Sequence, residues 1–495
     1  MTAIQIRLGR PALSLATLAL AGCAAFGPPR TPPPVSLPAH YAAAPPAALP
    51  SVALQGAAPQ GAEDGGQQLA VGAPVVSEWW HAYRSAELDA LVNEALTNSP
   101  SLAQARAKLT SAHEQLRAAI GSSLYPSLDA SAVAARASVP SLPFLPQGNS
   151  VLNIFAAGFQ AQWKFDPFGA SLLSKRSSAG QFREQEYEYI GARRALAANV
   201  VLAVITAASE QAQLDAQQRW ADFAEQRAAQ TRERLQLGSA SRFDALSDEA
   251  AAAQAARAIP ALRQQLLATR HAEAALLGRN PDQAPRPLPL DSLHLPERLP
   301  VSVPSALLRQ RPDILAAEAA VRAAADAAGA AKAALYPSLT LSAALSRGGT
   351  DWSSLFTPGG AAWLIGGGVT QPLFHGSALR AQARGAQADY EAAVAQYRQI
   401  VLTAFQSVAD DLAALDADAG QIEQTRRAAE ALDGMQQDLA QRFQSGSAPL
   451  SDVLASREQF QSARIQYLMA RAARLTDSAA LFDAMGEPGP QVAAR

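Results

Sequence analysis

Apolar residues alternate with small or polar residues along residues 155–166. Because successive side chains of a β-strand point to opposite faces, a period of two predicts a strand with one apolar face, expected over about residues 153–166. Weaker alternations predict three more strands, over about residues 125–138, 336–347 and 362–373. In the clearest of the four, the apolar positions are Phe155, Ala157, Phe159, Ala161, Trp163 and Phe165, and Gln160, Gln162, Lys164 and Asp166 lie between or after them.

The two faces of these strands differ in a way that suits a membrane. Aromatic side chains on one face and amides or charges on the other are typical of a strand between lipid and water, although a soluble sandwich shows the same alternation. Each strand has about ten residues, enough to cross a bilayer when tilted. Four strands cannot close a membrane barrel, since the smallest have about eight. A barrel therefore requires several chains, each of which donates four strands.

Long stretches without proline predict helices after each strand pair. At 1.5 Å per residue, the helix expected over about residues 170–236 would extend roughly 100 Å. Helix pairs of this length must pack on one another as coiled coils or surround a hollow cylinder. The remaining helices are expected over about residues 377–445, with returning helices at 242–278 and 450–485 and shorter helices at 85–120 and 305–335.

The chain contains a tandem duplication of about 210 residues. The letters LYPSL occur at Leu124–Leu128 and again at Leu335–Leu339. The run RLQLGSASRFDAL from Arg234 corresponds in the same way to RFQSGSAPLSDVL from Arg442. We predict repeat 1 over residues 77–284, a linker over 285–304, repeat 2 over 305–486 and a tail over 487–495. The predicted fold is therefore a mixed α/β membrane protein made of two repeats, each with two strands and long antiparallel helices.

The N-terminus has the pattern of a lipoprotein signal peptide over residues 1–22. Arg7 and Arg10 precede a short apolar run, and LAGC at Leu20–Cys23 matches the bacterial lipobox. We expect Cys23 to carry N-acyl and diacylglyceryl lipid, such as palmitate, and residues 23–76 to form a proline-rich tether; an ordinary signal peptide is the alternative. We find no other run of about 18 apolar residues, so a membrane-spanning part would have to be a closed β-barrel.

Composition and motifs argue against several other functions. With a net charge of −2 and a charged fraction of 17%, the chain has no excess of basic residues that would bind nucleic acid. The single cysteine excludes an intramolecular disulfide. Nucleophile-elbow, phosphate-loop and zinc motifs are absent, and DADAG at Asp416–Gly420 has Arg427 where a calcium loop needs glutamate. We predict no enzymatic activity, no metal and no cofactor other than the covalent lipid.

These features resemble the outer membrane factors, the TolC-like exit ducts of efflux and secretion systems, and in particular the NodT-type efflux lipoproteins. The residues that carry the resemblance are Leu20–Cys23, the doubled Tyr-Pro-Ser-Leu, the strand-to-helix junctions at 165–169 and 373–376, and the Gly-Ser-Ala turns. The resemblance implies a homotrimer with a twelve-stranded barrel in the outer membrane and a periplasmic α-helical barrel.

The resemblance also implies roles for the two turns. They would form the periplasmic tip that meets an adaptor protein, and Asp452, six positions after the second glycine, is a candidate for a ring of carboxylates at the constriction. Asp244 is the equivalent candidate in repeat 1, and a helix N-terminal carboxylate is the alternative for both. Ala448 and Pro449 stand where some members carry a basic residue, which puts a closing ion pair there in doubt, and Arg242 is a possible substitute. The tip candidates are Gly238, Ser239, Ala240, Arg242, Gly446, Ser447 and Ala448.

The predicted function is therefore a passive outer membrane duct of a tripartite efflux system. Its partners would be two more copies of the chain, a periplasmic adaptor, an inner-membrane pump and outer membrane lipid, with drugs or organic toxins as cargo. A type I secretion or metal-efflux channel is an alternative within the same class. A lipid-anchored periplasmic coiled-coil scaffold is the alternative outside it, but it leaves the aromatic alternation of 155–165 without a purpose.

Overall fold

The computed structural model describes residues 27–34, 67–73, 75–139, 150–357 and 361–486. The chain divides into two compact units. Unit 1 comprises residues 1–34, 108–186 and 316–398, and unit 2 comprises residues 35–107, 187–315 and 399–495. Each unit takes residues from both halves of the chain, so the predicted repeats at 77–284 and 305–486 are not separate compact domains. The reason is that the long helices α4 (Ala170–Gln236) and α8 (Ala378–Gln444) begin in unit 1 and end in unit 2.

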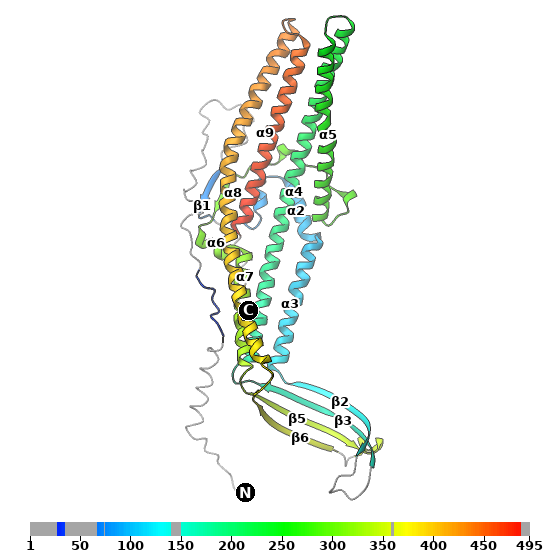
Figure 1. Cartoon of the computed structure of the whole chain (residues 1–495), viewed down its shortest axis with the longest axis vertical. Coiled ribbons are helices and arrows are strands. Elements are labelled where there is room, and N and C mark those ends of the chain that lie inside the picture. Colours follow the sequence, from blue (N-terminus) through cyan, green and yellow to red (C-terminus); the bar gives the residue numbers. More distant parts are fainter. Residues whose placement is uncertain (1–26, 35–66, 74, 140–149, 358–360, 487–495) are drawn as a thin grey trace. The chain divides into compact units, whose positions relative to one another are not determined.

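Unit 1 contains a four-stranded antiparallel sheet in the order β2-β3-β5-β6 (Figure 1). The strands are β2 (Ser127–Val139), β3 (Ser150–Phe165), β5 (Ser338–Gly349) and β6 (Ala361–Thr370). They follow one another in chain order, so β2 and β6 form the two outer edges of the sheet. The short helix η4 (Trp352–Leu355) follows β5, and the Trp352 ring meets the Phe155 ring edge to face at 5.8 Å between centroids.

Small residues allow the helices of unit 1 to approach closely. A Cβ atom added to Gly180 of α4 would lie 2.8 Å from the Cβ of Ala323 on α7 (Pro312–Ala333). The Phe168 ring, just before α4, stacks on Tyr336 of the second LYPSL at 4.9 Å between centroids. The tyrosine of this motif therefore fixes the junction between a helix and a strand.

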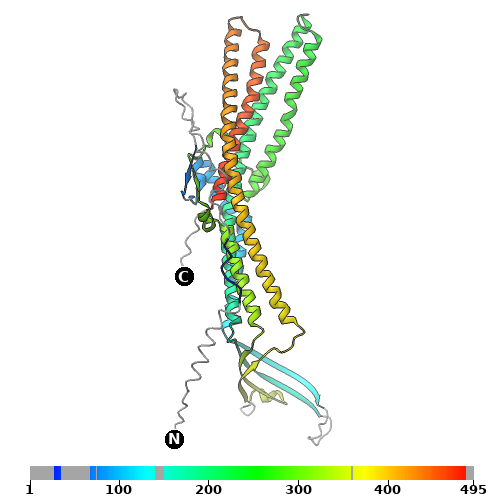
Figure 2. The ribbon, with the colours of Figure 1, turned by 60° about the vertical axis from the view of Figure 1, so that its left-hand side comes forward.

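Unit 2 contains two helical hairpins whose turns lie at the same, upper end of the unit in both views (Figures 1 and 2). One is formed by α4 and α5 (Arg242–Leu276), the other by α8 and α9 (Leu450–Met485). Below the hairpins, η1 (Trp79–Tyr83) packs on α9: Trp79 stacks on Phe482 at 5.2 Å, and the buried Tyr83 hydroxyl donates to the Leu475 carbonyl at 2.8 Å.

Parts of the predicted tether, residues 23–76, and of the predicted linker, residues 285–304, form a sheet. In unit 2, β1 (Gln68–Val71) pairs in parallel with β4 (Arg298–Val301). Leu299 and Val301 are buried, which explains why the pairing forms although it joins positions 230 residues apart. The other short elements of this region are η2 (Pro281–Gln283), η3 (Leu290–Ser292) and α6 (Pro304–Gln310).

Each of the two shorter predicted helices is broken at a proline. The first divides into α2 (Ala86–Asn98) and α3 (Pro100–Leu124), and the second into α6 and α7. Ser99 and Arg311, which precede the prolines, have extended backbone with ψ of 126° and 123°. A proline ring disfavours the helical conformation of the residue before it, whereas proline itself is well suited to the first helical position.

One helix of the described part, α4, has the length and apolar composition of a membrane span, contrary to the sequence-based expectation. Its most apolar 18-residue window has a mean hydropathy of 1.5, and 44% of that window is buried inside the protein. Val200, Val201, Val204 and Ile205 are among its fully or almost fully buried side chains. The window lies in a core-forming helix, so its hydropathy has a packing explanation.

Gly278, just after α5, tests the packing of unit 2. It has a φ of 75°, and an added Cβ would lie 2.6 Å from the Asn98 carbonyl oxygen. Because that oxygen belongs to the backbone, we expect Gly278→Ala to lower stability by about 1–3 kcal/mol. Gly420→Ala is the control, since nothing lies within 4 Å of its Cβ position inside α8, and it should raise stability by about 0.5–1 kcal/mol. Thermal unfolding of the detergent-solubilised protein measures both, and equal midpoints would contradict this account.

Candidate functional site

Strand register in unit 1 places the predicted apolar positions on one face of the sheet. Phe159 pairs with Ala130 and Leu345, and Leu345 pairs in turn with Trp363. Residues directly opposite each other on antiparallel strands point to the same face. The four alternating patterns therefore add up to one continuous apolar face. Its large members are Leu128, Val151, Phe155, Phe159, Trp163, Phe165, Leu339, Leu341, Leu345, Trp363, Ile365 and Val369, and Arg347, opposite Ala157, is a charged exception.

This apolar face is open in the single chain. Phe159 is 58% exposed, Leu345 54% and Trp363 75%. The opposite face carries polar pairs such as Gln160 with Asp129 and Lys164 with Thr340, and its large apolar exceptions include Val133, Leu152, Ile154 and Leu364. An exposed apolar patch that spans four strands marks a surface made for a partner or a membrane.

The first hairpin turn is stabilised from both sides by local hydrogen bonds. Gly238 has a φ of 72°, and the Ser239 amide donates to the Arg234 carbonyl at 2.8 Å, which terminates α4 in the pattern that favours glycine. Ser241 then caps α5: the Asp244 amide donates to the Ser241 hydroxyl at 3.0 Å, and the Ser241 amide donates to Asp244 at 3.1 Å. Hydrogen bonds from the Ser241 side chain and backbone lower the pKa of Asp244. Asp244 is therefore the second half of a capping box.

The second turn ends its helix in the same way but begins the next one differently. Gly446 has a φ of 75°, and the Ser447 amide donates to the Arg442 carbonyl at 2.8 Å. Pro449 precedes α9 and supplies no side-chain cap. Asp452 is exposed, and its carboxylate accepts from the neighbouring Ser451 hydroxyl at 3.3 Å. Although it stands at the same distance from its glycine as Asp244, Asp452 is not used to close the turn.

The predicted tip residues all lie in the two turns, at one end of unit 2 (Figure 2). Ala240 and Ala448 are half-buried. Arg242 begins α5 and is exposed, as are Leu237 and Phe243 beside it. The lipidation candidate Cys23 lies outside the described residues. Among the residues that the structure describes, no group of three His, Cys, Asp or Glu side chains could hold a metal ion.

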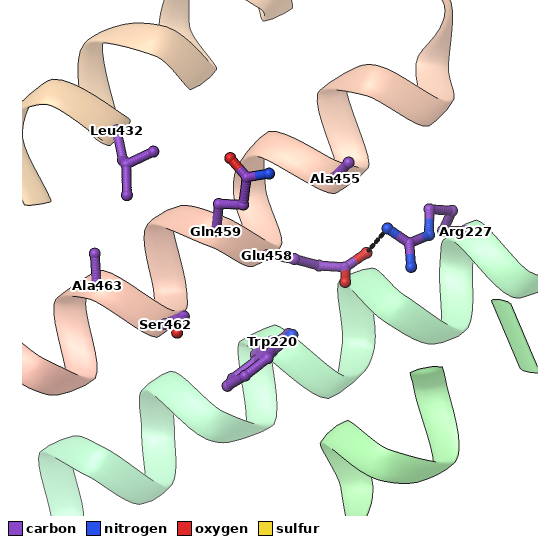
Figure 3. A pocket seen from close by; sticks show the side chains of 8 residues that line it. All are labelled: Trp220, Arg227, Leu432, Ala455, Glu458, Gln459, Ser462 and Ala463. Atoms are coloured by element: carbon purple, nitrogen blue, oxygen red, sulfur yellow. Dashed lines mark ion pairs between the residues drawn. The ribbon is translucent and has the colours of Figure 1, made fainter. Parts of the chain in front are cut away.

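Farther from the turns, a groove of about 550 Å³ lies between α4 and the α8–α9 hairpin (Figure 3). Arg227 of α4 contacts Glu458 of α9 at 3.0 Å and Asp248 of α5 at 3.1 Å, so one guanidinium joins three helices. Burial raises the pKa of Glu458, and Arg227 opposes that shift. The lining residues are Trp220, Arg227, Leu432, Ala455, Glu458, Gln459, Ser462 and Ala463.

The sequence analysis did not single out this group. Trp220 and Arg227 are seven positions apart and therefore share a face of α4, which was the one signal available. Nothing in the sequence pairs that face with Glu458, because the contact joins positions 231 residues apart and depends on how the hairpins pack.

The chain is similar to proteins of known class over most of its length. The family model described as outer membrane efflux protein matches residues 91–279 and 303–487. The pyoverdine export outer membrane protein OpmQ of Pseudomonas aeruginosa is 30% identical over 439 residues, which cover 84% of this chain and 89% of OpmQ. The toluene efflux pump outer membrane protein TtgC of Pseudomonas putida is 28% identical, with coverage of 85% and 87%. The solved structure of the outer-membrane channel OprN matches with a TM-score of 0.75 and 25% identity, over 84% of this chain and 93% of that one.

Replacing Arg227 tests the three-helix contact. Arg227→Met would leave the carboxylates of Glu458 and Asp248 next to one another in a largely buried place, and we expect a loss of about 1–3 kcal/mol. Arg442→Met is the control, since its pair with Asp438 at 2.8 Å is exposed on both sides and should contribute at most about 1 kcal/mol. Thermal unfolding measures the stability change, and hydrogen exchange of peptides from α4 and α9 locates it. An R227M variant as stable as R442M would contradict the structural role of Arg227.

Proposed function

Because the chain belongs to the outer membrane efflux protein family, we propose that three copies of it form a passive duct that carries small organic molecules from the periplasm to the exterior. The protein is an outer membrane channel component of an efflux system and extends into the periplasm. We propose with this function a trimer, a closed β-barrel, a lipid anchor and a gate.

The observation that carries the proposal is the single apolar face of the β2-β3-β5-β6 sheet with its two outer edges. An edge strand in hydrocarbon would leave backbone groups without hydrogen bonds, at a cost of several kcal/mol for each group. The four strands form a meander in which β2 and β6 are the outer strands and run in opposite directions. The β6 strand of one copy can therefore pair with β2 of the next copy, and neighbouring strands remain antiparallel throughout. Three copies would then close a barrel of twelve strands, with the apolar face toward lipid.

The hairpins of unit 2 support the periplasmic part of the proposal. Helices of 67 residues extend about 100 Å, far more than a lipid bilayer requires. Both turns lie at one end of the unit, where the exposed Leu237, Phe243 and Leu246 of the first turn offer apolar side chains to an adaptor protein. An inner-membrane pump behind that adaptor would supply the energy.

Asp452 is the better of the two gate candidates. Asp244 is occupied by the capping box, whereas the exposed Asp452 carboxylate accepts a hydrogen bond from the hydroxyl of its neighbour Ser451 and takes no part in closing the turn. In a trimer, three Asp452 carboxylates at the narrow end would attract cations and repel anions. Arg242, next to the first turn, would substitute for the basic residue that ties the tips shut in some family members.

The chain segment after Cys23 supports the lipid anchor. Within unit 1, residues 27–34 lie on α7, where Arg30 binds the buried Asp326 at 2.9 Å and Gly27 approaches Gly329. Three residues separate Cys23 from Gly27, so the two Cα atoms lie at most about 14 Å apart. Acyl chains on Cys23 would therefore be held close to the end of α7 that leads into β5, beside the sheet.

The oligomeric state is the first test. We expect native mass spectrometry of the detergent-extracted protein to show a trimer, because only additional copies can pair the edges of β2 and β6. The variant Cys23→Ala should still require detergent for extraction, since the sheet remains apolar. A water-soluble C23A monomer would instead support the lipid-anchored scaffold.

Channel recordings in planar bilayers test the gate. We expect Asp452→Asn to reduce the preference for cations over anions, because three negative charges leave the constriction, while the melting temperature stays unchanged. Asp244→Asn is the matched control. It should lower the melting temperature, because it weakens the cap of α5, and it should leave ion selectivity unchanged. Equal selectivity of the wild type and D452N would place the constriction elsewhere.

A further inference from the structure

Two arginines interrupt the apolar face of the β2-β3-β5-β6 sheet in unit 1. Arg136 of β2 stands opposite Asn153, and Arg347 of β5 stands opposite Ala157 and Ala361. Both arginines are exposed. They are the only charged residues on this face of the four described strands, so no carboxylate of the same face balances them. Positive charge on an otherwise apolar surface requires an explanation.

Both repeats carry this arginine at the same position. Arg136 and Arg347 each stand eleven positions after the tyrosine of their LYPSL motif. Five of the seven residues between the motif and the arginine differ between the repeats. The arginine is therefore shared by two strands whose other side chains mostly differ, which argues against a chance exception.

The arginines lie near the ends of their strands that face away from the helices. All four strands join helices at one end, because α3 precedes β2, α4 follows β3, α7 precedes β5 and α8 follows β6. Since the protein extends into the periplasm, the opposite end would be the outer one in the proposed barrel. Arg136 is three residues from the end of β2 at Val139, and Arg347 is two residues from the end of β5 at Gly349.

Aromatic rings mark the same level of the sheet. On the apolar face, Phe155 is a diagonal neighbour of both Arg136 and Arg347, because its partners on β2 and β5 stand two positions away from them. Trp352 of η4 meets the Phe155 ring edge to face and is 61% exposed. Tryptophan is enriched where the apolar part of a membrane meets water. The arginines therefore lie at the outer border of the apolar band.

The inner border of this band lies at the other end of β3. Trp163 and Phe165, whose ring centroids are 6.0 Å apart, stand there on the apolar face. From Phe155 to Phe165 the strand extends about 34 Å, or about 25 Å across the membrane at a tilt of about 40–45°. This is the usual height of the apolar band of a membrane barrel. A charged residue on the lipid face destabilises a barrel most at the middle of the bilayer and little near its borders, and the two arginines stand at a border.

We propose that Arg136 and Arg347 each bind an anionic, phosphate-bearing headgroup of an outer-leaflet lipid. The long arginine side chain can extend along the apolar surface and place its guanidinium among the headgroups, where its fork of N–H donors matches a phosphate. Two arginines from each of three copies would give six such contacts around the barrel. The inference rests on the proposed duct, because only a sheet with its apolar face toward lipid presents these arginines to headgroups.

Native mass spectrometry of the full-length protein in a neutral detergent tests the site. Phosphatidylglycerol, which is anionic, and phosphatidylcholine, which has no net charge, are added separately, and the lipids bound to the protein are counted. We expect the wild type to bind phosphatidylglycerol more tightly. In the double variant R136Q/R347Q this preference should fall, by about fivefold for each arginine removed.

Lys164→Gln is the matched control for Arg347→Gln, since each removes one positive charge. Lys164 stands opposite Thr340 on the other face of the sheet, near the end of β3 that leads into α4, so K164Q should keep the full preference. The variant R136K/R347K should keep most of it, because an ammonium group also attracts phosphate. If R136Q/R347Q does not fold, the single variants R136Q and R347Q give the same test.

Equal preference in the wild type and R136Q/R347Q, or an equal loss in K164Q, would overturn the site. Complete displacement of phosphatidylglycerol by excess inorganic phosphate would also overturn it, since the arginines would then take a free anion rather than a lipid. The same spectra count the chains. A trimer without the lipid preference would leave the duct standing, whereas a monomer would contradict the duct and the site together.

Discussion

A strand in a lipid bilayer must have every backbone amide and carbonyl hydrogen-bonded, because hydrocarbon offers no partner. In this protein β3 and β5 meet that requirement on both sides, whereas β2 and β6 meet it on one side only. The register that pairs Phe159 with Leu345 and Leu345 with Trp363 collects the apolar side chains on one exposed face. Pairing of these two edges with further copies of the chain, as proposed, would meet the requirement for β2 and β6 as well.

In the helical part the main constraint is that neighbouring helices lie close together. Side chains at helix contacts are often small, as at Gly180 against Ala323 and in the cluster of Ala221, Ala224, Ala228, Ala252 and Ala255 between α4 and α5. Such contacts gain less from apolar burial than a core of large side chains would. Polar bridges such as the one from Arg227 to Asp248 and Glu458 then specify which helices pair, at positions where removal of one partner is costly.

Equivalent positions in the two halves have acquired different chemistry. Asp244 and Asp452 both follow a positive-φ glycine by six residues, yet the serine at position 241 draws the first into a cap and the proline at position 449 leaves the second outside one. The two repeats thus keep the same backbone turn, whereas the side chains beside the turn differ.

Local signals in the sequence determined the elements and the turns. Period-two alternation identified β3, the absence of proline delimited α4 and α8, and Gly238 and Gly446 marked the reversals, because each of these depends on residues near one another in the chain. The breaks before Pro100 and Pro312 were readable by the same rule and were missed. Only the tertiary structure decided the pairing of β1 with β4 and the contact of Arg227 with Glu458. These contacts join positions 230 and 231 residues apart, and no local preference specifies which of many similar side chains the packing will bring together.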